Sequence, residues 1–217
     1  LQHARRIVKH VLGTYDPIEH GNLCRFSTKA CVGFPTSRSY LHDKAAAEPT
    51  GSYGHLRWFI GQRIVDKHLN DAFTHPYWKI YSQGENPDEQ NHSVWIRDEA
   101  VIDALNLINV PKSYKTLRGI TPNTLIGSYH SYGLGAMIAK RLMKVGIDLS
   151  RQPEEHKRVA KIQSRRDLRN LVTADLSNAS NCFTSQLVRK LVPLEWYRQL
   201  DLGRINTVVI EDKRYYM

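Results

Sequence analysis

Residues 171–180 read Leu-Val-Thr-Ala-Asp-Leu-Ser-Asn-Ala-Ser, and they suggest a strand, a carboxylate at its end and a helix. An apolar run ends at Asp175, and small polar residues then lead into a predicted helix at 179–191. A strand end holds a carboxylate rigidly at a sheet edge, and Mg²⁺ prefers hard oxygen donors of this kind. The alternative is that Asp175 or Ser177 only caps the helix that follows.

A second pattern lies upstream, where residues 110–118 read Val-Pro-Lys-Ser-Tyr-Lys-Thr-Leu-Arg. If this segment is extended, Lys112 and Arg118 share one face and Lys115 takes the other, whereas a turn between them could gather all three cations. Gathered cations suit a triphosphate, whose charge builds up as the bond to the leaving pyrophosphate breaks. The alternative is a basic loop that only meets solvent.

The net charge of +10 is unevenly distributed along the chain. Residues 1–110 contain 12 Lys/Arg and 12 Asp/Glu, whereas residues 111–217 contain 19 and 9. Concentrated positive charge favours a polyanionic partner, because neutralised phosphates release condensed counterions. A solvated basic face is the other interpretation, and charge alone does not separate the two.

The composition excludes several classes of protein. With 217 residues and 41% hydrophobic content, the chain can bury a core in one large domain or two small ones. It has no run of eighteen apolar residues, so no membrane span is expected. The odd count of three cysteines, without a CxxC pair, disfavours a disulfide scaffold or a zinc ribbon and indicates a reducing, intracellular protein. A metal cluster of Cys24 and Cys31 with His20 and His42 is a weaker alternative.

Hydrophobic periodicity gives a coarse map of the elements. It predicts helices at 2–12, 41–48, 54–73, 128–145 and 179–191, and a basic helix or helix-turn at 152–169. Gly13 and Gly146 are expected to end the first and the fourth of these. Residues 207–210 and 214–216 flank a predicted β-hairpin turn, and 94–110 fits a helix or a strand equally well.

Together and in this order, the two patterns resemble motifs of the RNA-phage (levivirus) replicases, which are RNA-directed RNA polymerases. Val-Pro-Lys-x-x-Lys-Thr-x-Arg at 110–118 resembles their phosphate-gripping fingers motif, and Thr-Ala-Asp-Leu-Ser-x-Ala-Ser at 173–180 resembles their first palm motif. Shorter matches extend the resemblance over nearly the whole chain, and they lie at 49–52, at His55-x-x-Trp58-Phe59, at 146–149 and at Pro193-x-x-Trp196.

The resemblance implies an α+β fold that forms part of a right-hand polymerase. The fingers and N-terminal region would occupy 1–109, a basic fingers segment with the phosphate-gripping motif would occupy 110–169, and the start of the palm, truncated, would occupy 170–217. The palm portion would hold its first strand, helix and hairpin.

It also implies a role for each candidate residue. Lys112, Lys115 and Arg118 would hold the incoming nucleoside triphosphate. Asp175, helped by the carbonyl of Leu176, would bind Mg²⁺, with Mn²⁺ as the alternative ion.

Ser180 and Asn181 would contact the nucleotide. Ser180 is small where reverse transcriptases place a bulky aromatic, which favours a ribonucleotide polymerase. Asn181 stands where the family has its second aspartate, so ribose recognition would keep hydrogen bonds but lose a charge. Thr121 departs as well, because family members commonly carry an acid before the proline at this point.

Residues 1–217 contain neither a Gly-rich palm segment nor a Gly-Asp-Asp turn. Since two-metal transfer needs those carboxylates, we expect a fragment that is inactive alone. The implied partners are template RNA, nucleoside triphosphates and host translation elongation factors, with no membrane, in the cytoplasm of an infected bacterium.

Two other functions stay open at this point. A non-enzymatic basic RNA-binding module would interleave aromatic residues with its cations, and residues 140–170 contain no aromatic. A relative that has lost polymerase activity is the third possibility, indicated only by Asn181.

Overall fold

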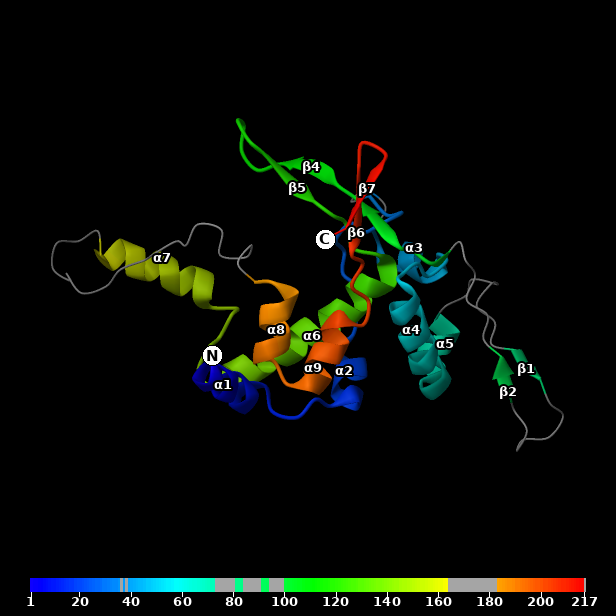
Figure 1. Cartoon of the computed structure of the whole chain (residues 1–217), viewed down its shortest axis with the longest axis horizontal. Coiled ribbons are helices and arrows are strands. Elements are labelled where there is room, and N and C mark those ends of the chain that lie inside the picture. Colours follow the sequence, from blue (N-terminus) through cyan, green and yellow to red (C-terminus); the bar gives the residue numbers. More distant parts are fainter. Residues whose placement is uncertain are drawn as a thin grey trace. The chain divides into compact units, whose positions relative to one another are not determined.

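The computed structural model describes residues 1–35, 37, 39–72, 81–83, 91–93, 100–163 and 183–216 (Figure 1). The helices are α1 (Gln2–Leu12), α2 (Pro17–Leu23), α3 (Leu41–Ala46), α4 (Tyr53–Val65), α5 (Lys67–Ala72), α6 (Leu125–Lys144), α7 (Gln152–Gln163), α8 (Ser185–Leu191) and α9 (Leu194–Asp201). The strands are β1 (Tyr81–Gln83), β2 (Asn91–Ser93), β3 (Ala104–Asn106), β4 (Ile108–Pro111), β5 (Leu117–Ile120), β6 (Thr207–Ile210) and β7 (Lys213–Tyr216). The mixture of helices and small sheets agrees with the predicted α+β class.

The chain divides into two compact units. Unit 1 comprises Leu1–Glu19 and Gly135–Gln199, and unit 2 comprises His20–Leu134 and Leu200–Met217. These units are defined by spatial contacts, so the functional segments predicted at 1–109, 110–169 and 170–217 stay predictions.

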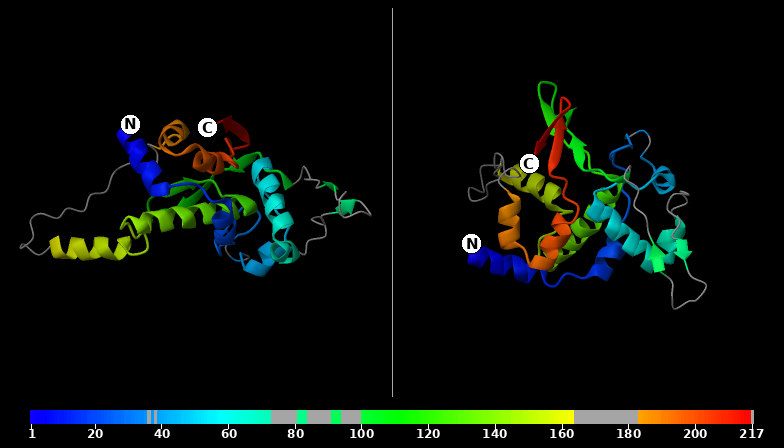
Figure 2. Two further views of the ribbon diagram at one scale, coloured as in Figure 1. Left: turned by 90° about the horizontal axis from the view of Figure 1, so that it is seen from below. Right: turned by 45° about the vertical axis from the view of Figure 1, so that its right-hand side comes forward.

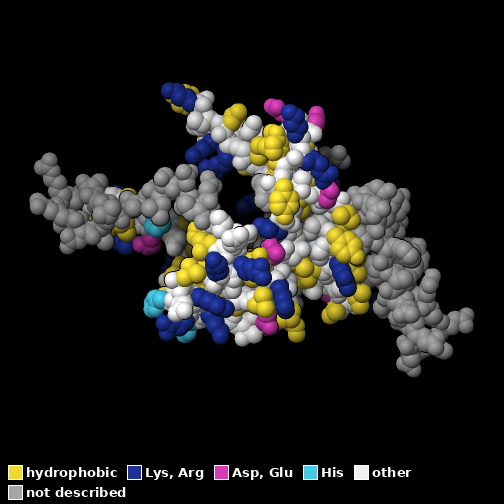
Figure 3. Space-filling model, in the orientation of Figure 1, with side chains coloured by type: hydrophobic (Ala, Val, Ile, Leu, Met, Phe, Trp, Pro, Cys, Tyr) yellow, Lys and Arg dark blue, Asp and Glu magenta, His cyan; other side chains and the backbone are white. Residues whose placement is uncertain are grey.

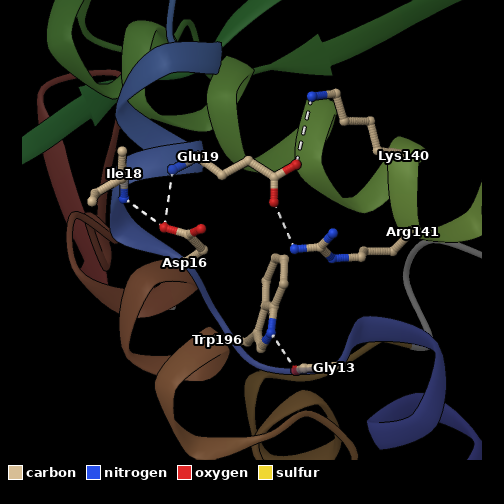
Figure 4. A network of polar contacts seen from close by, with 7 residues as sticks. All are labelled: Gly13, Asp16, Ile18, Glu19, Lys140, Arg141 and Trp196. Carbon is tan, nitrogen blue, oxygen red and sulfur yellow. Dashed lines mark hydrogen bonds and ion pairs between the residues drawn. The ribbon is translucent and has the colours of Figure 1, made fainter.

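In unit 1, the end of helix α1 is fixed by a tryptophan (Figure 4). Gly13 ends the helix as predicted, with a φ of 61° that an L side chain rarely adopts. Its carbonyl accepts a 3.0 Å hydrogen bond from the indole Nε1 of Trp196, which is fully buried at the start of α9. Tyr15 packs edge-on against the same indole, with ring centroids 5.5 Å apart. The first and the last helices of this unit are therefore joined.

An ion-pair network ties the start of α2 to α6 within the same unit (Figure 4). Glu19 accepts from the Arg141 guanidinium at 2.6 Å, and the Lys140 ammonium lies 3.5 Å from its other carboxylate oxygen. Asp16 accepts from the backbone N–H groups of Ile18 and Glu19, at 2.8 and 3.1 Å. Both carboxylates are thus engaged where α2 begins.

Helix α6 confirms the prediction at 128–145 but begins three residues earlier. The buried Thr124 hydroxyl accepts from the Gly127 N–H at 3.1 Å, which caps the first turn. At the other end, Gly146 has a φ of 85° and the Ile147 N–H donates to the Leu142 carbonyl. This is the glycine-ended helix terminus that the sequence predicts.

Two helix predictions were wrong in extent. The helix expected at 54–73 is interrupted at Asp66, whose backbone is extended and whose side chain accepts from the Leu69 N–H at 3.1 Å. A good capping residue thus starts a second helix, α5, where periodicity alone suggested continuation. Similarly, Thr184 is extended and caps α8 through the Leu187 N–H, so α8 begins at Ser185 and the helix predicted at 179–191 is not continuous through Thr184.

Other predictions lie partly outside the described residues. Helix α7 confirms the first part of the segment predicted at 152–169. The strand predicted at 170–175, which ends at Asp175, and the first residues of the helix predicted at 179–191 are not among the described residues. Over the described part of the chain, no helix combines the length and the apolar character that a membrane crossing requires.

The core of unit 2 forms between α4 and the first half of α6. Leu56 and Phe59 are fully buried and face Leu125 and Ile126, which are also fully buried. The buried members of this cluster are Cys31, Leu56, Phe59, Ile60, Ala100, Leu125, Ile126 and Tyr129. Apolar burial of this extent is the main stabilising contribution to the unit.

Three histidine rings pack together beside this core. The rings of His20 and His55 lie 4.7 and 4.9 Å from that of His130, measured between centroids, and Trp58 closes the group at 4.6 Å from His130. His20 Nε2 lies 3.0 Å from the His130 carbonyl oxygen. Burial lowers the pKa of His55 to about 4 and also lowers the pKa of His20. Both rings are therefore held neutral at pH 7.

We expect unit 2 to lose stability in mild acid. The unfolded chain binds a proton at His55 near pH 6.5, whereas the folded chain binds it only near 4, so stability is full above about pH 6.5 and falls as the pH drops toward 4. Between about pH 7.5 and about pH 5, His55 alone should reduce the free energy of unfolding by roughly 2 kcal/mol. Urea denaturation at both pH values measures this. His55→Phe should flatten the dependence, and His68→Gln, on the exposed surface of α5, should not. Equal pH dependence in His55→Phe and the parent chain would contradict the assignment.

A three-stranded sheet of order β3-β6-β7 lies in unit 2. Strand β6 pairs in parallel with β3 and antiparallel with β7, which confirms the hairpin predicted at the C-terminal end. Its turn residues, Glu211 and Asp212, both have positive φ, as tight two-residue hairpins require. The stretch at 94–110, which sequence left open, includes the strands β3 and β4. In the right-hand view of Figure 2, the β4–β5 and β6–β7 hairpins both project from unit 2.

Candidate phosphate-binding hairpin

The residues predicted to grip a triphosphate form the β4–β5 hairpin. Val110 pairs with Arg118 and Pro111 pairs with Leu117, so residues 112–116 make the tip. The turn considered from sequence is therefore present. Proline fits the last pair of this two-stranded ladder because, in the part of the chain that the structure describes, each strand pairs on one side only.

Hydrogen bonds order the tip. The backbone N–H groups of Lys112 and Ser113 both donate to the Thr116 carbonyl, at 2.9 and 3.2 Å. The Ser113 and Thr116 hydroxyls lie 2.7 Å apart, and the Ser113 hydroxyl also accepts from the Lys115 N–H at 3.3 Å. Backbone bonds thus continue past Pro111 to Thr116, and two hydroxyl side chains close the tip beyond them.

The three cations are all exposed, and their positions differ. Lys112 and Lys115 lie in the tip, whereas Arg118 lies on β5 opposite Val110. Among the described residues, none of the three forms an ion pair. Figure 3 shows Lys and Arg side chains over the end of this hairpin. Their charge is therefore available to an external anion.

Tyr114 is a candidate site residue that sequence analysis did not single out. Its side chain is 92% exposed at the tip, and the Lys115 ammonium lies 5.1 Å from its ring centroid. An exposed ring beside a cation can stack on a nucleic-acid base. In the sequence, its position between Lys112 and Lys115 is the signal that points to it.

The base of the hairpin is attached to the sheet. Leu107 alone separates β3 from β4, and its N–H donates to the Val209 carbonyl at 3.0 Å. A Cβ atom at Gly119 would lie 3.3 Å from the Leu107 side chain, so β5 packs closely against Leu107 at this point. Asp103 and Arg214 join β7 to the residue before β3 by a 2.6 Å ion pair. The exposed arm thus rises from an ordered base.

The remaining predicted site residues are not placed. Asp175, Leu176, Ser180 and Asn181 lie outside the described residues, so the metal and ribose roles stay predictions. Within the described ranges, no three His, Cys, Asp or Glu side chains form a group that could hold a metal ion, and this includes the cysteines at 24 and 31. Burial raises the pKa of Cys24 to about 12, so this thiol is protonated and a poor metal ligand at neutral pH.

An ordered, exposed cationic arm on a mixed helical and stranded protein is a feature that attracts polyanions such as nucleic acid. The chain belongs to the RNA replicase, beta-chain family, because the sequence model of that family matches residues 1–216.

Similar proteins from three phages agree with this membership. The RNA-directed RNA polymerase beta chain of Enterobacteria phage GA is 29% identical over 194 residues, which cover 88% of this chain and 33% of that protein. The beta chain of Enterobacteria phage fr is 35% identical over 56% of this chain and 23% of its own length. That of Escherichia phage MS2 is 35% identical over 48% of this chain and 19% of its own. The matched region thus covers a third or less of the length of each of these relatives. The resemblance to phage replicases is confirmed.

Proposed function

We propose that this chain is the nucleotide-gripping part of a phage RNA-directed RNA polymerase that copies an RNA genome. The observation that carries the proposal is the ordered hairpin whose cations at 112, 115 and 118 are exposed and without ion-pair partners among the described residues. Family membership supports the reaction class. Template-directed incorporation by a polymerase that contains this chain tests it, and no incorporation on an RNA template would overturn it.

In the proposed mechanism, the hairpin acts on the triphosphate. Lys112 and Lys115 would neutralise phosphate oxygens as point charges, and Arg118 would offer its planar fork of N–H donors. Negative charge grows on the leaving pyrophosphate as the nucleotide is transferred, so these contacts strengthen in the transition state. The hairpin would therefore contribute to rate as well as to binding.

Asp175 would hold the metal ion. Its carboxylate and the Leu176 carbonyl form an all-oxygen donor set, which is the chemistry that Mg²⁺ and Mn²⁺ accept. When bound, the ion would stabilise charge on the transferred phosphate. Since two-metal transfer needs further carboxylates, we propose that the chain works as part of a longer polypeptide and is inactive alone.

The proposal extends to partners and location. Template RNA and nucleoside triphosphates would be bound, host translation elongation factors would join the replicase, and the reaction would occur in the cytoplasm of an infected bacterium.

A second candidate function, a non-enzymatic RNA-binding module, has one observation in its favour. Tyr114 lies between two exposed lysines, as in surfaces that stack single-stranded bases. RNA binding without any incorporation by the complete polymerase would favour this function.

Asn181→Ala should reduce the discrimination between ribonucleotides and deoxyribonucleotides. The side-chain amide can donate to and accept from the ribose hydroxyls, and alanine can do neither. The ratio of kcat/KM for a ribonucleotide over its deoxy counterpart should fall by about tenfold, as expected for the loss of one or two such hydrogen bonds. RNA affinity should stay close to that of the parent enzyme. An unchanged ratio would make Asn181 an ordinary helix residue.

A further inference from the structure

A basic hollow lies between α1 and α8, within unit 1. Its volume is about 540 Å³, and it is lined by Leu1, Gln2, Arg5, Gln186, Arg189 and Lys190. Three of these six side chains are cations, two are amides and none is a carboxylate. The hollow therefore has the electrostatics of an anion site.

Helical spacing explains how the cations gather. Gln2 and Arg5 lie three residues apart on α1, and Gln186 and Arg189 lie three apart on α8, so each helix presents an amide and a guanidinium on one face. Neither helix contains an Asp or Glu, so neither supplies a counter-charge of its own. Figure 3 shows Lys and Arg side chains gathered over α8 and its surroundings.

The hollow is built on fixed helices. The bond from Trp196 to the Gly13 carbonyl holds the end of α1, and the Thr184 cap fixes the start of α8. The nearest acids along the chain from α1, Asp16 and Glu19, are already engaged by N–H groups and by Lys140 and Arg141. An incoming anion therefore meets cations carried by helices whose ends are fixed.

The cationic row continues along α1. Lys9, one turn beyond Arg5, lines a second hollow of about 420 Å³ with Arg198 of α9, where Glu195 is the one carboxylate among the described lining residues. An extended ligand that follows α1 would thus meet a cation at each turn. A row of this kind fits a chain of phosphates better than a single small anion.

The hollow between α1 and α8, with Gln2, Arg5, Gln186, Arg189 and Lys190, is called the basic groove below. We propose that this basic groove binds the backbone of single-stranded RNA. The guanidinium and ammonium groups would contact phosphates, and the glutamine amides can donate to and accept from 2′-hydroxyls. Among the described residues, no aromatic ring lines the hollow between α1 and α8, so binding through these residues would be sequence-independent. The site rests on the proposed function only in taking RNA as the partner, and it differs from the triphosphate hairpin in residues and in unit.

The test compares adjacent arginines of one helix. Arg5 lines the groove and Arg6 does not, although both are exposed residues of α1. Affinity of the 217-residue chain for a fluorescent oligouridylate is measured by anisotropy across a salt series.

Arg5→Gln should lower the slope of log K against log salt by about 0.7, and Arg5→Gln with Arg189→Gln by about 1.4. The double variant should lose affinity on the order of tenfold at about 0.1 M salt. Arg6→Gln, with the same change in net charge, should leave the slope unchanged.

Further controls separate location from charge and from folding. Arg5→Lys should keep the parent slope, and equal thermal unfolding midpoints should show that the variants fold. Equal slopes for Arg5→Gln and Arg6→Gln would overturn the proposal. Competition by polyglutamate as strong as that by RNA would assign the groove to an acidic protein instead. In the complete polymerase, the groove variants should show normal incorporation at saturating RNA, so failure of the groove and failure of the polymerase assignment give different results.

Discussion

Replacing Asp175 by Asn in a polymerase that contains this chain should abolish nucleotide incorporation while leaving RNA affinity nearly unchanged. An amide has almost the size of a carboxylate but carries no charge, so it cannot replace an anionic oxygen donor to Mg²⁺. Metal stabilisation of the transferred phosphate contributes several kcal/mol, so a loss of roughly 10³-fold or more is expected. Single-nucleotide incorporation over a Mg²⁺ and Mn²⁺ titration measures it.

A matched control is available in the β6–β7 turn. Asp212 is exposed and has a φ of 63°, a conformation that Asn also adopts, so Asp212→Asn should fold and incorporate normally. Equal loss of RNA binding and incorporation in Asp175→Asn would assign that residue to folding instead.

Sequence predicted best the elements whose signals are local. Gly13 and Gly146 marked helix ends because positive φ excludes most other residues, and the β-branched run before Glu211 located a true hairpin. The break at Asp66 was not predicted. The apolar residues keep their helical spacing across it, so the pattern indicates one helix although Asp66 caps a second one. The α4–α6 core and the histidine group depend on residues far apart in sequence, so no local pattern could reveal them.

The candidate site was predictable only where chemistry is concentrated in one segment. The cations of the hairpin fall within residues 112–118, so their spacing alone suggested a shared ligand. The basic groove joins α1 with α8, and its pairs Gln2 with Arg5 and Gln186 with Arg189 acquire meaning only when the helices are adjacent. Tyr114 needed its exposure to be known.

The second large effect is expected at Arg118 of the hairpin. Losing one preorganised contact to charge that develops in the transition state typically costs about 2.7–4 kcal/mol. Arg118→Ala should therefore reduce the rate of single-nucleotide incorporation by roughly 10²–10³-fold. Arg118→Lys keeps the charge but loses the planar fork of N–H donors. Its incorporation rate should therefore lie between the rates of Arg118→Ala and of the parent enzyme. Lys213→Ala, a change to an exposed cation of the neighbouring β6–β7 hairpin, should have little effect.

Template affinity across a salt series separates the two places where Arg118 could act. If it contacts the triphosphate, the slope for RNA binding stays unchanged while incorporation falls, since no RNA phosphate has lost a partner. If it contacts the template, the slope decreases by about 0.7, and incorporation at saturating RNA stays near normal. Arg118 lies on a paired strand rather than in the tip, so its backbone is held by the ladder. A fixed backbone favours the triphosphate, because only a preorganised cation stabilises a transition state without reorganising first.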